Sequence, residues 1–141
     1  MPGSFFDTNI LIYLASSDPV KAERAETIIS GGGTISVQVL NELANVARRQ
    51  MRLSWKDTRA LLSMIRGLLA VNPITTEIHE NGLALAERYS FSIYDAMIVA
   101  SALHADCGVL WSEDMRDGMT IAKSLRVVNP FVRTNPNNPR E

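Results

Sequence analysis

Short apolar runs and helix-spaced apolar positions alternate along this chain and predict strands and helices in turn. The apolar residues 5–6 fit a buried strand, and apolar residues with helical spacing follow over 10–14. Later apolar or β-branched runs predict strands at 34–37, 71–75, 109–112 and 125–128. Apolar stripes between them predict helices at about 19–30, 38–50, 55–70, 76–89 and 96–103. Pro73 limits the strand that contains it to a short or edge position, because proline has no backbone N–H to donate.

This order of strands and helices predicts an α/β fold, a three-layer α/β/α sandwich with a central, mainly parallel sheet. With 141 residues and 46% hydrophobic content, the chain fits one domain with a buried core. We expect this domain to cover residues 1–133. Residues 134–141 hold no apolar side chain, so we expect a disordered or loosely attached tail there.

Charge is sorted along the sequence, although the formal net charge is only −1. Such a chain is not a strongly basic body that binds nucleic acid by charge alone, so any such binding must be local. Residues 48–66 carry six basic side chains and one acidic one, whereas residues 67–119 carry eight acidic and two basic ones. The basic residues form either a solvated face or a track for an RNA backbone, and the candidates for the track are Arg48, Arg49, Arg52 and Lys56.

The single cysteine, Cys107, excludes an internal disulfide and suits a reducing compartment. It has no second cysteine with which to form a Cys-type metal site. The N-terminus shows no signal-peptide pattern, and the longest apolar run is much shorter than a membrane span. We therefore expect a soluble, cytoplasmic protein with no membrane partner.

Four acidic residues stand where predicted strands end or where helices begin. Asp7 and Asp114 follow strands, and Glu42 and Asp95 lie early in helices on the same side of the predicted sheet. In an open parallel sheet the ligand crevice lies beyond the carboxyl ends of the strands. All four carboxylates can therefore converge at one site.

Each of these acids also has a purely structural interpretation. Asp7 can cap the first helix, as short polar residues often do. Glu42 can be a surface glutamate paired with Arg49. Asp95 can cap its own helix, although Ser92 is available for the same role.

Converging carboxylates repel one another, and a hard divalent cation with oxygen ligands is the usual way to keep them ionised. Mg²⁺ or Mn²⁺ held in this way can activate a water for in-line attack on a phosphodiester. The sequence offers no other catalytic set, since it lacks Gly-x-Ser-x-Gly, His-Glu-x-x-His and a usable Cys/His pair. The triplet 31–33 lacks the Lys-Ser/Thr of a phosphate-binding loop, so we interpret it as a helix stop.

Several short segments together resemble the PIN domain family, and most closely the small single-domain toxins of the VapC type. The resemblance covers residues 5–131 and lies in segments 6–11, 40–42, 94–96, 112–118 and 126–131. Each segment is a weak signal alone, but their order and spacing together are specific.

The resemblance implies a PIN-like fold and a Mg²⁺- or Mn²⁺-dependent endoribonuclease, the toxin of a type II toxin–antitoxin system. It also implies an RNA substrate, a homodimer and a cognate antitoxin as partner. Matched position by position, the acidic catalytic and metal-binding residues are Asp7, Glu42, Asp95 and Asp114, and the polar supports are Thr8, Asn9 and Ser112. Many family members carry a further acid soon after the fourth, for which Asp117 ranks before Glu113.

Two other functions are compatible with the sequence. The first is a non-catalytic module of the same fold that binds RNA or a protein partner, for which the basic residues would matter and Asp95 would not. The second is a small phosphohydrolase with an aspartyl-phosphate intermediate. Such enzymes need a second aspartate two positions after the first, and Asn9 occupies that position here.

Overall fold

The computed structural model describes residues 3–131, and in them six strands form one sheet in the order β3-β2-β1-β4-β6-β5. Every neighbouring pair is parallel except β5 and β6, which are antiparallel. The mainly parallel sheet predicted from the sequence is therefore confirmed. The strands are β1 (Ser4–Phe6), β2 (Thr34–Ser36), β3 (Ala70–Asn72), β4 (Val109–Trp111), β5 (Thr120–Ile121) and β6 (Leu125–Val128).

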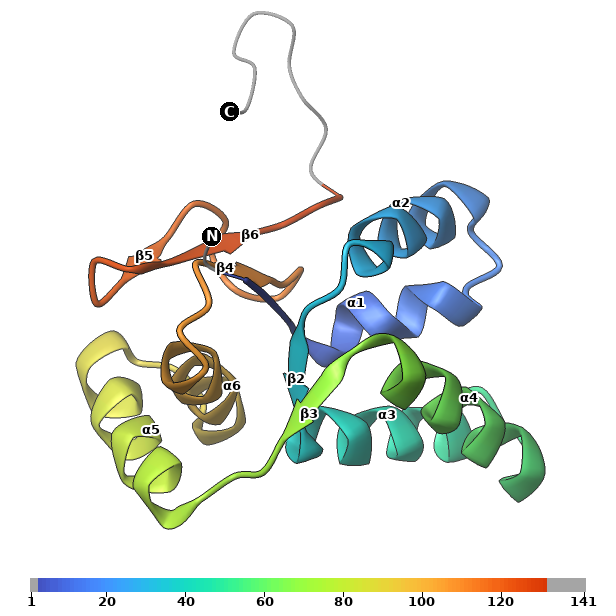
Figure 1. The fold of residues 1–141 in the computed structure, drawn as a ribbon, viewed down its shortest axis with the longest axis horizontal. Coiled ribbons are helices and arrows are strands. Elements are labelled where there is room, and N and C mark those ends of the chain that lie inside the picture. The colour runs from blue at the N-terminus through green and yellow to red at the C-terminus, as the bar shows by residue number, and fades with distance from the viewer. Residues whose placement is uncertain (1–2, 132–141) are drawn as a thin grey trace, which may run out of the picture.

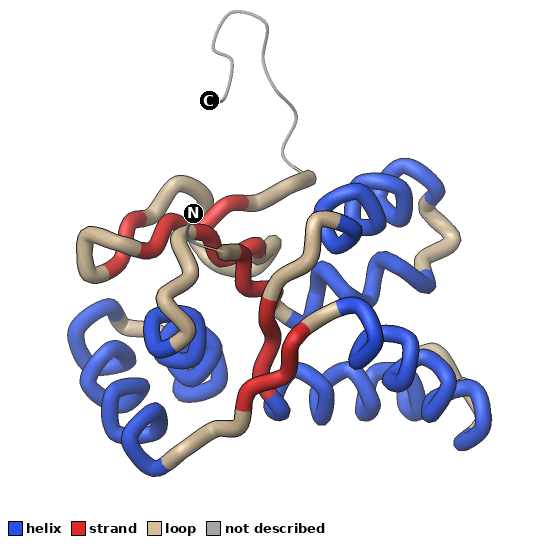
Figure 2. The backbone as a smooth tube through the Cα atoms, in the orientation of Figure 1, coloured by secondary structure: helices blue, strands red, loops and turns tan. Residues whose placement is uncertain are grey.

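Helices cover both faces of the sheet and complete the predicted three layers. Figure 1 shows α5 and α6 together on one side of the sheet and α1, α2, α3 and α4 on the other. In Figure 2 the strands lie between these two groups of helices. The helices are α1 (Thr8–Ile12), the short 3₁₀ helix η1 (Tyr13–Ala15), α2 (Pro19–Ser30), α3 (Val37–Arg49), α4 (Trp55–Leu68), α5 (Thr76–Tyr89) and α6 (Ile93–His104).

Short polar side chains fix where the helices begin. The hydroxyl of Ser36 accepts a hydrogen bond from the Val39 amide, so α3 begins at Val37 and the preceding strand ends one residue earlier than predicted. β3 ends before Pro73 and lies at the edge of the sheet, as the missing N–H of proline requires. The two-residue strand β5 was not predicted, because Thr120–Ile121 has no apolar run of its own and becomes a strand by pairing with β6.

The centre of the sheet and α6 form the most deeply buried part of the core. Phe5 and Phe6 on β1 are fully buried, and every residue of α6 from Ala96 to Ala102 is buried, as its apolar composition predicted. Gly33 allows β2 to begin close against β1. A Cβ at Gly33 would lie 2.6 Å from the Phe6 ring and from the Ser4 carbonyl oxygen.

The chain reverses its direction of travel across the sheet at β1. From β1 it proceeds to β2 and β3 on one side, and it later returns to place β4 on the other side of β1. The crevice beyond the carboxyl ends of β1 and β4 is therefore a topological switch point, where open α/β sheets bind their ligands. None of the helices in residues 3–131 combines the length and hydrophobicity that crossing a bilayer requires.

The predicted tail, residues 134–141, lies outside the described residues. The division into one domain over 1–133 and a tail stays a prediction.

Candidate active site

Asp7 lies at the switch point, immediately after β1. Its Oδ1 accepts a hydrogen bond from the Thr8 amide over 2.7 Å, and its Oδ2 accepts one from the Ser112 hydroxyl over 2.8 Å. The residue is 4% exposed. Asp7 therefore does cap α1, as the structural alternative proposed, and its second oxygen is in contact with the segment that follows β4.

Burial raises the pKa of Asp7 from its ordinary value to about 6. The hydrogen bonds from Ser112 and Thr8 favour the charged form and oppose this rise. The carboxylates of Asp95 and Glu42 repel the charge on Asp7 and add to it. Both acids therefore lie near enough to Asp7 to affect its ionisation, and a bound cation would stabilise the ionised form.

Glu42 points from α3 toward the beginning of α1. Its Oε2 accepts a hydrogen bond from the Thr8 hydroxyl, and its Oε1 lies 3.4 Å from Nε2 of Gln38, one helical turn earlier. Thr8 therefore connects Asp7 and Glu42, since its amide contacts one carboxylate and its hydroxyl the other.

Asp95 lies in the first turn of α6 and is free of the capping role. Ser92 caps this helix, because its hydroxyl accepts a hydrogen bond from the Asp95 amide over 3.2 Å. Burial raises the pKa of the Asp95 carboxyl, and repulsion by the Asp114 carboxylate raises it further. The structure thus brings Asp95 near both Asp7 and Asp114.

Asn9 bridges two of the acids. Its Nδ2 lies 3.0 Å from Oδ2 of Asp114 and 3.3 Å from Oδ2 of Asp7. Its Oδ1 accepts a hydrogen bond from the Glu113 amide over 3.1 Å. One side chain on α1 therefore both bridges the carboxylates and positions the loop after β4 on which Asp114 lies.

The possible ligands at this place are carboxylate and hydroxyl oxygens, which suit a hard cation such as Mg²⁺ or Mn²⁺. Within residues 3–131, no three His, Cys, Asp or Glu side chains stand close enough together to form a ready-made metal cage. The carboxylates instead make hydrogen bonds to Thr8, Asn9 and Ser112. The raised pKa of the buried Asp7 fits a site whose charge a cation balances.

The two candidates for a fifth acid have other partners in the structure. Glu113 forms an ion pair with Lys21 at 3.2 Å and accepts a hydrogen bond from the Tyr13 hydroxyl over 2.8 Å. Oδ1 of Asp117 accepts a hydrogen bond from the Asn129 amide over 2.8 Å. A role for Asp117 as a metal ligand stays a prediction, and the contacts of Glu113 favour a role in holding the loop.

The sequence matches the PIN domain family over residues 4–117. This chain belongs to the PIN domain family. The resemblance and the fold class predicted from the sequence are both confirmed. A search of curated proteins found no match to this chain.

Several solved structures share the fold of this PIN domain. A toxin–antitoxin complex from Klebsiella pneumoniae matches with a TM-score of 0.69 and 27% identity over 91% of this chain and 98% of that one. VapC20 of Mycobacterium tuberculosis, a toxin that cleaves the sarcin–ricin loop, matches with a TM-score of 0.65 and 18% identity over 79% of this chain and 91% of that one. FitAcB from Neisseria gonorrhoeae matches with a TM-score of 0.63 and 18% identity, over 91% and 98% of the two chains.

The predicted basic track of the PIN domain separates into two kinds of residue. Arg48 donates a hydrogen bond to the Leu53 carbonyl over 2.6 Å, and its guanidinium lies 4.2 Å from the centre of the Trp55 ring. Its side chain therefore holds the connection between α3 and α4. The other three predicted residues of the track are exposed: Arg49, Arg52 and Lys56. Their contact with an RNA backbone stays a proposal.

Sequence reasoning missed Gln38, which joins two of the site's elements. Its Nε2 donates to the Tyr94 carbonyl over 3.0 Å and lies 3.4 Å from Oε1 of Glu42. α3 is thereby tied to the first turn of α6, beside Asp95. The position of Gln38 four residues before Glu42 was the one signal of this contact, since side chains at that spacing meet on a helix.

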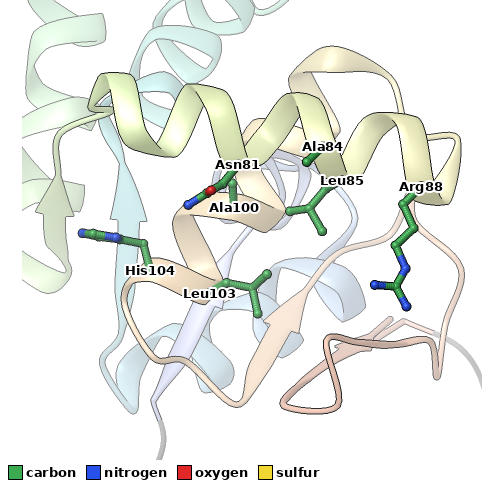
Figure 3. Close-up of a pocket in the computed structure, with 7 residues that line it drawn as sticks. All are labelled: Asn81, Ala84, Leu85, Arg88, Ala100, Leu103 and His104. Atoms are coloured by element: carbon green, nitrogen blue, oxygen red, sulfur yellow. The ribbon is translucent and has the colours of Figure 1, made fainter.

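A separate pocket of about 380 Å³ lies between α5 and α6. Figure 3 shows Leu85 and Leu103 beside it, with Arg88 and His104 at opposite ends. None of the predicted site residues lines it, so the acids of the PIN domain and this hollow are different places on the molecule.

Proposed function

We propose that this PIN domain is a metal-dependent endoribonuclease and the toxin of a type II toxin–antitoxin system. The observation that carries the proposal is the buried carboxylate of Asp7 at the switch point, with Glu42 and Asp95 near enough to raise its pKa. The family and the similarity to a toxin–antitoxin complex support it, as does the fold shared with an RNA-cleaving toxin.

In this proposal Asp7, Glu42, Asp95 and Asp114 hold Mg²⁺ or Mn²⁺. Such a cation would lower the pKa of an attacking water and stabilise negative charge on the phosphodiester. Three polar side chains orient the carboxylates through the hydrogen bonds described above: Thr8, Asn9 and Ser112. Asp117 is the candidate for a further ligand.

The same proposal includes partners and a place of action. A cognate antitoxin would block the toxin, as the complexes among the structural neighbours suggest. We further propose a homodimer that acts on RNA in the cytoplasm, without a membrane partner.

The test is RNA cleavage by the purified chain with Mg²⁺, with Mn²⁺ and with EDTA, on fragments of tRNA, rRNA and mRNA. We expect cleavage with a metal and none with EDTA. Asp7→Asn and Asp95→Asn should abolish it while the circular dichroism spectrum stays that of a folded protein. Glu87→Gln is the matched control, because Glu87 is an exposed acid on α5 away from the site.

Two results would contradict the proposal. One is a wild-type chain that cleaves none of these RNAs with any of several divalent metals. The other is cleavage that persists in Asp7→Asn and Asp95→Asn at the level of Glu87→Gln. Binding of RNA without cleavage would favour the non-catalytic module instead.

A further inference from the structure

Two neighbouring hollows run along the exposed side of α3, beginning at the acidic site. The first has a volume of about 390 Å³ and is lined by Gln38, Asn41, Glu42, Asn45 and Tyr94. The second, of about 420 Å³, is lined by Ala44, Asn45, Arg48, Arg49 and Trp55. Because Asn45 lines both and Glu42 lines the first, they form one continuous surface that leads away from the acids. We call this surface the α3 strip.

An exposed aromatic ring stands at each end of the α3 strip. Tyr94 is 69% exposed and Trp55 is 62% exposed. Trp55 is held in place, because Arg48 lies 4.2 Å from its ring centre and is itself hydrogen-bonded to the Leu53 carbonyl. Gln38 holds the backbone of Tyr94. Both rings are exposed, and that of Trp55 is also held by a contact, so they suit stacking against a flat ligand.

Three carboxamide side chains occupy the helix between the two rings. Gln38, Asn41 and Asn45 follow one another at three- and four-residue spacing, so they share one face of α3. Gln38 and Asn45 are separated by about 10 Å along the helix, which is the length of roughly three stacked nucleotides. A carboxamide carries both donors and acceptors and can therefore pair with the edge of an unpaired base.

The charge of the α3 strip changes from one end to the other. Glu42 lies at the Tyr94 end, beside the candidate metal site, and Arg49 lines the hollow at the Trp55 end. Two more exposed basic residues stand close to Trp55 in the sequence, Arg52 and Lys56. Basic side chains beside an aromatic ring fit a chain that presents phosphates and bases alternately. A duplex would keep its bases stacked and paired, and the two rings could then not stack on them.

We infer that the α3 strip binds a single-stranded segment of RNA and leads it to the acidic site. Trp55 and Tyr94 stack on bases, the carboxamides contact base edges, and the basic side chains near Trp55 contact phosphates. This inference rests on the proposed ribonuclease function and names the form of RNA and the residues that bind it. Arg48 acts as a positioning residue for Trp55.

The test measures binding without cleavage. Full-length protein in EDTA is titrated into a fluorescently labelled oligouridylate of about eight nucleotides, a length within the range that such surfaces bind, and fluorescence anisotropy gives the Kd. Trp55→Ala and Tyr94→Ala should each weaken binding about tenfold, the usual effect of losing one base–aromatic stack. Trp55→Phe and Tyr94→Phe keep a ring and should retain most of the affinity.

Met64→Ala is the matched control, because Met64 is 48% exposed on α4 and lines neither hollow. Sedimentation velocity on every variant follows self-association. The inference is overturned if the wild type does not bind the oligonucleotide, or if it binds a duplex of the same length equally well. It is also overturned if Trp55→Ala binds the oligonucleotide as tightly as Met64→Ala does. This includes the case in which Trp55→Ala changes the self-association of the protein but not its affinity for RNA.

The failure of the inference and the failure of the proposed function give different results. A wild type that cleaves RNA while the aromatic variants bind normally would overturn the α3 strip alone. A wild type that binds single-stranded RNA through these rings but cleaves nothing with any metal would overturn the nuclease proposal alone.

Discussion

The hydroxyl of Ser112 donates a hydrogen bond to Oδ2 of Asp7 over 2.8 Å, although the two residues are 105 positions apart in the sequence. β1 and β4 pair in parallel up to Phe6 and Trp111, so the next residues of both strands emerge side by side. Asp7 is held from its own helix by Thr8 and from the neighbouring strand by Ser112. The pairing of the two strands therefore determines the orientation of the most buried acid.

Replacing Ser112 with alanine should weaken metal binding and RNA cleavage about 10- to 100-fold, the usual cost of losing a group that orients a metal ligand. The variant leaves a buried carboxylate oxygen without this donor and also removes the acceptor for the Met115 amide. Titration of Mn²⁺ by calorimetry and a cleavage assay measure the two effects.

Ser101→Ala is the control for this change. Ser101 is equally buried, but its hydroxyl donates to the Met97 carbonyl within α6. It should leave metal affinity near the wild-type value. Equal metal affinities of Ser112→Ala and wild type would show that the hydrogen bond to Asp7 does not orient a ligand.

The stability of the metal-free protein should fall as the pH rises from about 4 to about 7. The folded state raises the pKa of Asp7 from 3.8 to about 6, so it holds this proton more tightly than the unfolded state does. The contribution of Asp7 is therefore fully favourable below the unfolded pKa and is lost as the pH rises through the folded one. Two pKa units correspond to about 3 kcal/mol.

Asp7→Asn removes this titration and should gain about 3 kcal/mol of unfolding free energy relative to wild type between pH 4 and pH 7. Urea denaturation in EDTA at several pH values measures the difference. Saturating Mn²⁺ should restore the unfolding free energy of the wild-type protein above pH 6. It should stabilise Asp7→Asn much less. A difference between the two proteins that is the same at every pH would contradict the assignment of the raised pKa to Asp7.

The fold was predictable from the sequence because its signals are local. Asp18, Ser36, Ser54, Thr75 and Ser92 each cap the helix that follows, and the apolar spacing predicted the buried side of those helices. Element ends shifted by up to three residues where a cap or a proline decided them, as at the start of α6 after Ser92 and at the end of β3 before Pro73. The strand β5 could not be predicted, because Thr120–Ile121 is extended only through its pairing with β6.

The site was predictable only in part. The positions of Asp7 and Asp114 after strands indicated that both face one crevice, because parallel strands end on the same side of a sheet. The contacts between the acids depend on side chains that are far apart in the sequence, as in the bond from Asn9 to Asp114. No periodicity predicts such a contact. The same reason explains why the ion pair of Glu113 with Lys21 was not foreseen.

Gly33→Ala should destabilise the fold by about 2 kcal/mol or more, because overpacking and backbone strain add here. Gly33 has a φ of +152°, and a Cβ there would lie 2.6 Å from the Phe6 ring and the Ser4 carbonyl. Gly67 on α4 is the matched control, since a Cβ there meets nothing within 4 Å. Gly67→Ala should stabilise the protein by about 0.5–1 kcal/mol. Equal melting temperatures of the two variants would contradict the close approach of β2 to β1.

Asn9 makes two kinds of contact, a bridge to two carboxylates and a hydrogen bond to the Glu113 amide. Alanine and aspartate at this position remove different ones, so the two variants test which contact matters. Asn9→Ala loses both the donor that bridges Asp7 and Asp114 and the acceptor for the Glu113 amide. Asn9→Asp keeps an acceptor for that amide but replaces the bridging donor with a third carboxylate.

If the bridge orients the acids, both variants should lower RNA cleavage about tenfold or more, and added carboxylate repulsion should make Asn9→Asp the less stable at neutral pH. Hydrogen exchange at the Glu113 amide should be faster in Asn9→Ala and near normal in Asn9→Asp. Full cleavage activity in Asn9→Asp together with loss in Asn9→Ala would assign the effect to the loop after β4, because only the amide contact survives in the active variant.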